Sequence, residues 1–536
     1  MPDREDRDHD HGRDRGGDRR ANGRGRSRRR GGARGWLTGR GPLTRTLILA
    51  TAVIVVAAGG FAGYRRLSDP SCGEGLVKRG RHQECTGVTD GSHVFDPNLR
   101  DVSARIKAEN DRAVRRPHVT IAMMVPMAPE DQVERQQTLR EVQGAYLAQY
   151  RANEQSEELP AIRLVLANPG RESAEWRPVA DRLVGMVGGG DHLRAVFGIN
   201  LSTAATKATI LRLTGKGVPV VGGPVTANDF RDIPGLFAIV PSNGEQAAAL
   251  TSFNKNIDVR KTLVVEDTRP NDNYVATLAR TFEKTTEGAP RAAEQFRSPD
   301  DPLDPGTNAN DFAQMVNSMC NSAAETVYFA GRPLQLRLFV NALGGRWCKQ
   351  KQYTVVTVSG ASTLALDAKL DWSALDPGKG LTVEYATITH PDAWTTAGAP
   401  PTGGSKDDFE ALRRLAAGEG SATPVGPIGP VDLNDGRTIT THDSAWTAIT
   451  AIRSRVTPRA PVPAIADVLN ARARMHGDGR VRGASGWICL DNNGDAYDKA
   501  VAIVRLVPQE PHIRFAGLAW PTGHPPAQDC TAPPAH

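Results

Sequence analysis

The stretch LRAVFGINLSTAATKATILRLTGKGVPVVGG, residues 193–223, alternates between strand-like and helix-like patterns. LRAVFGI (193–199) is a short apolar run, a helix is expected from about Ser202 to Thr214, and VPVVGG (218–223) is the next apolar run. Short apolar strands that alternate with helices predict a parallel sheet with helices on both faces.

The same alternation continues on both sides of this stretch. Further strands are predicted at 119–125, 162–168, 261–267, 325–331 and 353–359, and further helices at about 131–153 and 174–187. Because the strand pattern starts again at Lys261, the sequence predicts two α/β lobes. A Gly/Pro-rich stretch at 393–431, with a helix near 407–417, is predicted to be an insertion or surface loop.

The basic residues are concentrated in a short N-terminal tail. The chain has 536 residues and a formal net charge of +6, but residues 1–45 alone hold 14 Arg and 7 Asp or Glu. The tail therefore carries +7 and the rest of the chain −1. A tail with so few aliphatic residues is expected to be disordered. RNA or anionic lipid could bind it, but a basic flank to a membrane segment is the commoner explanation, and no nucleic-acid partner is expected.

An uncharged run, TLILATAVIVVAAGGFAGY, occupies residues 46–64. At about 1.5 Å per residue it is just long enough to cross the hydrocarbon core as a transmembrane helix. The arginines before it favour a cytoplasmic N-terminus and an extracellular body. We therefore expect an uncleaved signal anchor and a single-pass protein of the cell membrane. A signal peptide cleaved near Ala58, Gly60 or Ala62 is the alternative.

All six cysteines follow the membrane segment. An even number of cysteines in an exported domain predicts three disulfides, with 15 possible connectivities. Sequence order suggests Cys72–Cys85, Cys320–Cys348 and Cys489–Cys530, each closing a local loop. Metal binding is the alternative, but the chain has no CxxC or HxxxH spacing, so neither a metal nor a cofactor is expected.

Two polar loops follow adjacent strands of the expected sheet. Residues 198–202 read GINLS and residues 222–226 read GGPVT. In parallel sheets, ligands bind at the carboxyl ends of strands, where helix N-termini point N–H groups outward. The two loops could together hold a carboxylate, although Ser202 could also be merely the cap of the following helix. No GxSxG, HExxH, Walker or GxGxxG motif is present, so no enzymatic activity is expected.

Six stretches together carry a family resemblance. They are GINLSTAATKATILRLTGKGVPVV (198–221), FAIVPSNGEQAAAL (237–250), VVEDTRPNDNYVATLARTF (264–282), VYFAGRPLQLRLFVNAL (327–343), THDSAWTAITAI (441–452) and GASGWICLDNNGDAYDKAVAIV (483–504). In this order and spacing, residues 118–508 resemble the type I periplasmic-binding-protein fold of the leucine/isoleucine/valine-binding family of solute-binding proteins.

The resemblance implies two doubly wound parallel-sheet lobes that close on a ligand around a hinge of three crossovers. These crossovers are expected near Ser242–Gly244, Thr387–Pro391 and Gly483–Gly486. The implied organisation is a tail (1–45), a transmembrane helix (46–64), an extension with a disulfide loop and a helix (65–117), lobe 1 (118–243 and 389–484), lobe 2 (244–388 and 485–520) and a C-terminal tail (521–536).

The resemblance also implies a ligand site. Its residues would be Ser202 for the ligand carboxylate, Pro224 and Thr226 on the neighbouring loop, Tyr274 covering the ligand from lobe 2, Arg332 and Ser362. Two of these positions depart from the family pattern. Arg332 stands where amino-acid binders usually have a tyrosine, and Gly360-Ala361-Ser362 stands where an acid usually holds the ammonium. Arg332 therefore favours an anionic ligand, with Asp267 or Glu384 left as alternative sources of the acid.

The expected function is that of a membrane-tethered extracellular solute-binding protein. It would capture a small amino-acid-like or anionic ligand for an ABC permease or another membrane partner, in transport or in sensing. An interaction protein that kept the fold without a ligand is the first alternative, and an α/β enzyme is the second.

Overall fold

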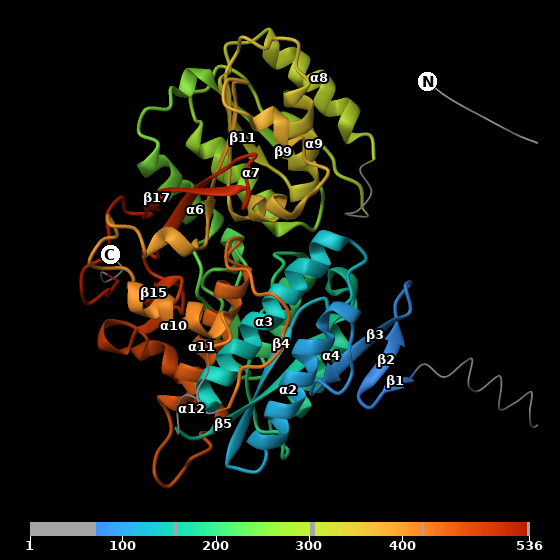
Figure 1. Ribbon diagram of the computed structural model, residues 1–536, viewed down its shortest axis with the longest axis vertical. Helices are drawn as coiled ribbons and strands as arrows, with labels where there is room; N and C mark the ends of the chain where they lie inside the picture. The colour runs from blue at the N-terminus through green and yellow to red at the C-terminus, as the bar shows by residue number, and fades with distance from the viewer. Residues whose placement is uncertain (1–70, 155–157, 301–305, 420–422, 533–536) are drawn as a thin grey trace, which may run out of the picture. The chain divides into compact units, whose positions relative to one another are not determined.

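The computed structural model describes residues 71–154, 158–300, 306–419 and 423–532. The expected tail (1–45) and membrane segment (46–64) lie outside these described residues. Among the described residues, no helix is long and apolar enough to span a bilayer. Two large sheets organise the described chain into two lobes (Figure 1).

Lobe 1 contains an eight-stranded sheet with the order β1-β2-β3-β5-β4-β6-β7-β8. Its strands are β1 (Ser71–Gly73), β2 (Leu76–Arg79), β3 (Glu84–Thr89), β4 (His118–Met124), β5 (Ala161–Asn168), β6 (Leu193–Phe197), β7 (Val220–Gly222) and β8 (Leu236–Ala238). The strands from β5 to β8 pair in parallel. Its main helices are α2 (Arg100–Ala113), α3 (Gln132–Glu154), α4 (Trp176–Gly185), α5 (Ala204–Thr214), α10 (Lys406–Ala416), α11 (Arg437–Arg453) and α12 (Ile465–Leu469).

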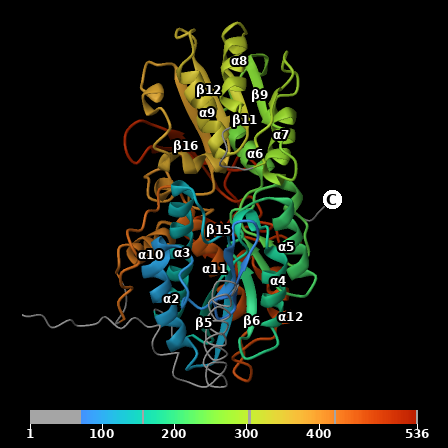
Figure 2. The same cartoon turned by 90° about the vertical axis from the view of Figure 1, so that its right-hand side faces the viewer.

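Both faces of this sheet are buried. On β4, Ile121 and Met123 contribute to the core beneath α2, α3 and α11, whereas Ala122 and Met124 contribute to the core beneath α4 and α5. Successive strand residues point to opposite faces, so a continuous apolar run is what a doubly covered strand requires. Figure 2 shows the two helical layers on either side of the sheet. The predicted α/β lobe with helices on both faces is therefore confirmed.

Lobe 2 contains a seven-stranded sheet with the order β10-β9-β11-β12-β13-β16-β17. Its strands are β9 (Thr262–Asp267), β10 (Glu294–Phe296), β11 (Thr326–Ala330), β12 (Tyr353–Thr357), β13 (Leu381–Thr387), β16 (Val501–Leu506) and β17 (Ile513–Ala519). Helices α6 (Asn243–Phe253) and α7 (Asn273–Thr285) cover one face, and α8 (Asn308–Cys320) and α9 (Pro333–Gly344) cover the other. The first five strands pair in parallel, and β16 and β17 are antiparallel additions.

The chain passes between the lobes three times. The first passage lies between Ala238 and Asn243 and the second follows Thr387, as expected from the resemblance. The third comes later than expected. Strand β15 (Gly486–Ile488) pairs with β14 (Val481–Gly483) beside lobe 1, and Ala496 still donates its N–H to the carbonyl of Ala238. The crossover therefore follows Ala496 and not Gly483–Gly486.

Two segments expected at the periphery belong to lobe 1. The N-terminal extension adds β3 antiparallel to β5, and α2 packs on the same core. The Gly/Pro-rich stretch contains the predicted helix as α10, but it also buries Val425 and Ile428 against α3. The carbonyls of these two residues accept hydrogen bonds from Tyr146 and Gln143 of α3. The stretch therefore covers part of the lobe 1 core. Its few apolar residues are too widely spaced in the sequence to predict this packing.

Three disulfides form with the predicted pairing: Cys72–Cys85, Cys320–Cys348 and Cys489–Cys530. The first closes the N-terminal hairpin and the third ties the C-terminal segment to lobe 1.

Helix α3 packs unusually close to α11 at Gly144. A Cβ added to Gly144 would collide with the Thr438 carbonyl oxygen of α11. Glycine at this position allows α3 and α11 to pack closely in the core of lobe 1.

Candidate functional site

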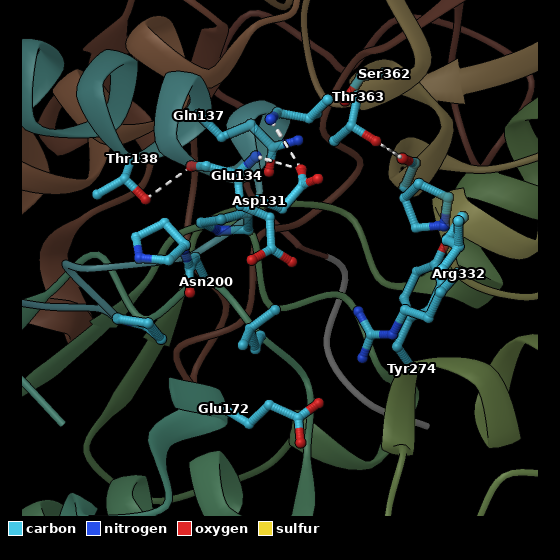
Figure 3. A pocket seen from close by; sticks show the side chains of 18 of the residues that line it. Asp131, Glu134, Gln137, Thr138, Glu172, Asn200, Tyr274, Arg332, Ser362 and Thr363 are labelled. Carbon is cyan, nitrogen blue, oxygen red and sulfur yellow. Dashed lines mark hydrogen bonds between the residues drawn. The ribbon is translucent and has the colours of Figure 1, made fainter. Parts of the chain in front are cut away.

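A cavity of about 950 Å³ lies between the lobes and is lined by both. The lobe 1 wall comes from the loops that follow β4, β6 and β7, together with the start of α11. The lobe 2 wall comes from the loops that follow β9, β11 and β12. These are carboxyl ends of parallel strands, where this class of fold places its ligands. Figure 3 shows side chains of both walls around the cavity.

Ser202 joins the two lobe 1 loops that the sequence singled out. Its buried hydroxyl accepts the backbone N–H groups of Thr226, at 3.1 Å, and of Ala227, at 3.3 Å. Helix α5 is instead capped by Thr203, whose hydroxyl accepts the N–H of Thr206. The interpretation of Ser202 as the cap of this helix is therefore wrong. Because its oxygen accepts two bonds, its own hydrogen is left to donate.

The lobe 2 wall holds the remaining predicted residues. Tyr274, in the first turn of α7, is buried, and its backbone N–H donates to the Ser202 carbonyl at 3.0 Å. Its ring lies 4.8 Å from the Arg332 guanidinium. Ser362 donates its hydroxyl to the Ser359 carbonyl within the 3-10 helix η6 (Ser359–Leu366). All six predicted residues, with Pro224 and Thr226 on the other wall, line the same cavity. Their contact with a ligand stays a prediction.

Arg332 has a partner that is distant from it in the sequence. Its guanidinium donates to both carboxylate oxygens of Asp272, each at 2.8 Å. Asp272 is 4% exposed and also caps α7 by accepting the N–H of Val275. A bidentate pair of this kind neutralises the arginine. Arg332 therefore does not present an uncompensated positive charge, and the inference of an anionic ligand loses its basis.

The two alternative acids do not reach the cavity. Asp267 is buried and accepts hydrogen bonds from Ser298 and from the backbone of Arg269. Glu384 is buried in β13 and forms an ion pair with Arg505 at 2.8 Å. Neither lines the cavity. Both carboxylates are held within lobe 2, so they are not sources of a ligand-binding charge.

Glu134, in the first turn of α3, is an acid of lobe 1 that faces the cavity. Its side chain is exposed to the cavity and points toward the space that Arg332 faces from the other wall (Figure 3). Burial by the surrounding walls raises the pKa of Glu134 to about 7, and repulsion from Asp131 and Glu172 adds to this shift. The sequence offered little sign of this role, because an acid in the first turn of a helix is ordinary.

Several contacts join the lobes across the cavity rim. Arg269 of lobe 2 pairs with Glu172 of lobe 1 at 3.0 Å. The Ala204 N–H donates to the Asn271 carbonyl at 3.1 Å. With the bond between Tyr274 and Ser202, these contacts hold the two walls together in a closed arrangement.

Comparison with known proteins shows the fold and not a family. No protein-family model matches the chain, and no curated protein matches it in sequence. Solved structures do match. The leucine-binding protein LivK of Thermotoga maritima is 16% identical with a TM-score of 0.53, covering 75% of this chain and 98% of its own. LivJ of Streptococcus pneumoniae, in complex with isoleucine, is 14% identical with a TM-score of 0.53, over 75% and 99%.

A third similar structure was solved with a different ligand. A solute-binding protein of R. palustris, in complex with 4-hydroxybenzoate, is 12% identical with a TM-score of 0.53, over 75% of this chain and 96% of its own. The mixed α/β architecture with parallel sheets is consistent with the type I periplasmic-binding-protein fold. These structural neighbours are solute-binding proteins and not enzymes.

Proposed function

We propose that this chain is a solute-binding protein that captures one small molecule in the cavity between its lobes. The observation that carries the proposal is the cavity itself. It lies at the carboxyl ends of strands from both sheets, and residues of both lobes line it. A site shared by two lobes couples binding to closure, since a ligand that contacts both walls stabilises the closed arrangement.

We further propose that the protein acts at the outer face of the cell membrane. The support is the apolar run at 46–64 and the arginine-rich tail before it, both outside the described residues. The three disulfides fit an oxidising compartment. Delivery to an ABC permease is the partnership that the similar structures suggest, and sensing through another membrane partner is the alternative.

A thermal-shift screen of the full-length protein tests ligand capture. The panel holds amino acids, amines, organic acids and aromatic acids. A ligand present at 100 times its Kd stabilises the folded state by about 2.7 kcal/mol. If no compound raises the Tm, the protein is an interaction protein that kept the fold. If the protein consumes a compound, it is an enzyme.

A matched pair of variants locates the binding. Ala204 is exposed and lines the cavity, so Ala204→Trp fills the cavity without displacing core residues. Leu211 lies on the same helix, is 50% exposed and does not line the cavity. We expect Ala204→Trp to lose the ligand-induced shift and Leu211→Trp to keep it. Equal shifts in both variants would place the ligand elsewhere.

A further inference from the structure

Among the residues that the structure describes, the charges around the cavity include a carboxylate without a partner. Nine acidic and six basic residues line it. The five arginines form ion pairs: Arg332 with Asp272, Arg269 with Glu172, Arg337 with Asp367, Arg437 with Glu141, and Arg171 with Glu130. The sixth cation, Lys369, is exposed on the loop that follows η6. The walls therefore offer a ligand little uncompensated positive charge.

Among the acidic lining residues, most have defined roles. Asp272, Glu172, Asp367 and Glu130 belong to the arginine pairs above. Asp435 pairs with Arg140 at 2.8 Å. The remaining acids are Glu84, Asp131, Asp300 and Glu134. The Glu84 carboxylate accepts the backbone N–H of Arg171. Asp300 and Lys369, both exposed on lobe 2, form no ion pair among the described residues, and their opposite formal charges cancel in the sum over the cavity walls.

Asp131 lies just before the first residue of α3 and Glu134 lies in the first turn, and their carboxylates have different contacts. The Asp131 carboxylate accepts the N–H groups of Val133, at 2.8 Å, and Glu134, at 3.2 Å, and so caps the helix. The Glu134 backbone N–H is held by this cap, and its carbonyl accepts the Thr138 hydroxyl. Within the described residues, the Glu134 carboxylate has neither an ion pair nor a hydrogen bond.

We propose that Glu134 is the specificity-determining residue of the cavity and that the captured ligand carries a protonated amine, which Glu134 binds. The inference rests on the proposed function. The Glu134 carboxylate opens onto the cavity and the arginines nearest to it are already paired, so a cationic ligand group would supply the partner that the protein does not. In this proposal the acid that binds the amine, Glu134, belongs to lobe 1. The lobe 2 segment 360–362, where the family resemblance places such an acid, reads Gly-Ala-Ser.

The groups that face Glu134 support the same assignment. Asp131 from its own helix and Glu172 from the loop before α4 make the local potential negative. Arg171 and Arg332 oppose this effect, but each is already paired with a carboxylate. The Arg332 side chain points toward the cavity from lobe 2 in Figure 3, and the Asp272 carboxylate bound to it compensates its charge. The net field at Glu134 favours a cation.

Paired probes that differ only in charge test the proposal. Putrescine is compared with 1,4-butanediol, and L-leucine with 2-hydroxy-4-methylpentanoate, by thermal shift and calorimetric titration of the full-length protein at pH 8. We expect an amine to bind and its hydroxyl counterpart to bind at least tenfold more weakly. Glu134→Gln keeps the side-chain shape and removes the charge. It should weaken amine binding by about tenfold to a hundredfold, the range expected for a charged hydrogen bond.

Glu283→Gln is the matched control. It removes the same charge from an exposed position on α7 that does not line the cavity, and it should leave amine affinity unchanged. Equal amine binding by wild type and Glu134→Gln, or binding of hydroxyl or anionic probes alone, would overturn the assignment of Glu134 and leave solute capture standing. If no probe of any charge binds, both proposals fail.

Discussion

The pair between Arg332 and Asp272 gives the sharpest test of how the cavity wall is built. Arg332→Ala removes a guanidinium that makes two hydrogen bonds of 2.8 Å to a carboxylate that is 4% exposed. Breaking a fully buried ion pair costs about 3–5 kcal/mol, because one charge is left uncompensated. The Arg332 side chain is 22% exposed at the cavity, so water can reach the vacated space. We therefore expect a loss of about 2–3 kcal/mol in the free energy of unfolding.

The assay is guanidinium-induced unfolding of the full-length protein without ligand. Arg260→Ala is the control, because the Arg260 side chain is 81% exposed and its bond to Asp258 lies at the surface, where solvent screening leaves such a pair little effect on stability. In the double variant Arg332→Ala/Asp272→Asn, the loss should be smaller than the sum of the losses measured for Arg332→Ala and Asp272→Asn.

The opposite result would refute this reasoning. If Arg332→Ala is as stable as Arg260→Ala and binding of a carboxylate ligand is lost, then Arg332 acts as a ligand residue. The pair with Asp272 would then contribute little to the wall.

Three further predictions follow from named contacts. Gly144→Ala should destabilise lobe 1 by about 1–3 kcal/mol through overpacking against α11, while Gly185→Ala, where nothing lies within 4 Å of the added Cβ, should be neutral or stabilising in the same unfolding assay. Ser202→Ala leaves two buried N–H groups without their acceptor and should cost about 1–3 kcal/mol, measured in the same way. The pKa of Glu134 is raised to about 7, so the carboxylate is largely neutral at pH 6 and charged at pH 8. Amine affinity measured by calorimetry should therefore rise about tenfold between these pH values, and should stay flat in Glu134→Gln.

The sequence predicted the fold well because the signals involved are local. Buried strands such as β4 and β11 appear as mostly apolar runs, and the helices between the strands have apolar spacing. Cysteine order was enough to pair the disulfides, because each one closes a short loop. The third crossover was misplaced because β15 and the loop after it have the composition of either lobe, and only their pairing beside β8 assigns them to lobe 1.

The site could be predicted only in part. The loops at Ser202 and Thr226 were found because both follow adjacent strands, and the structure joins them by a hydrogen bond. The net charge of the cavity walls could not be predicted, because it depends on which charged side chains form ion pairs in the folded protein. Asp272 lies 60 residues before Arg332 in the chain, yet it neutralises the cation that had suggested an anionic ligand. Glu134 stands out only because the neighbouring acids Asp131 and Glu172 have partners, whereas its own carboxylate has none among the residues that the structure describes.

The central claim is that a ligand closes the two lobes around the cavity, and a distance between the lobes tests it most directly. All six cysteines are in disulfides, so spin labels can be placed at Ala174→Cys on lobe 1 and Ala313→Cys on lobe 2, two exposed positions that do not line the cavity. Double electron–electron resonance should show a distribution that becomes shorter and narrower when the ligand found in the thermal-shift screen is added. An unchanged distribution at saturating ligand would contradict capture by closure.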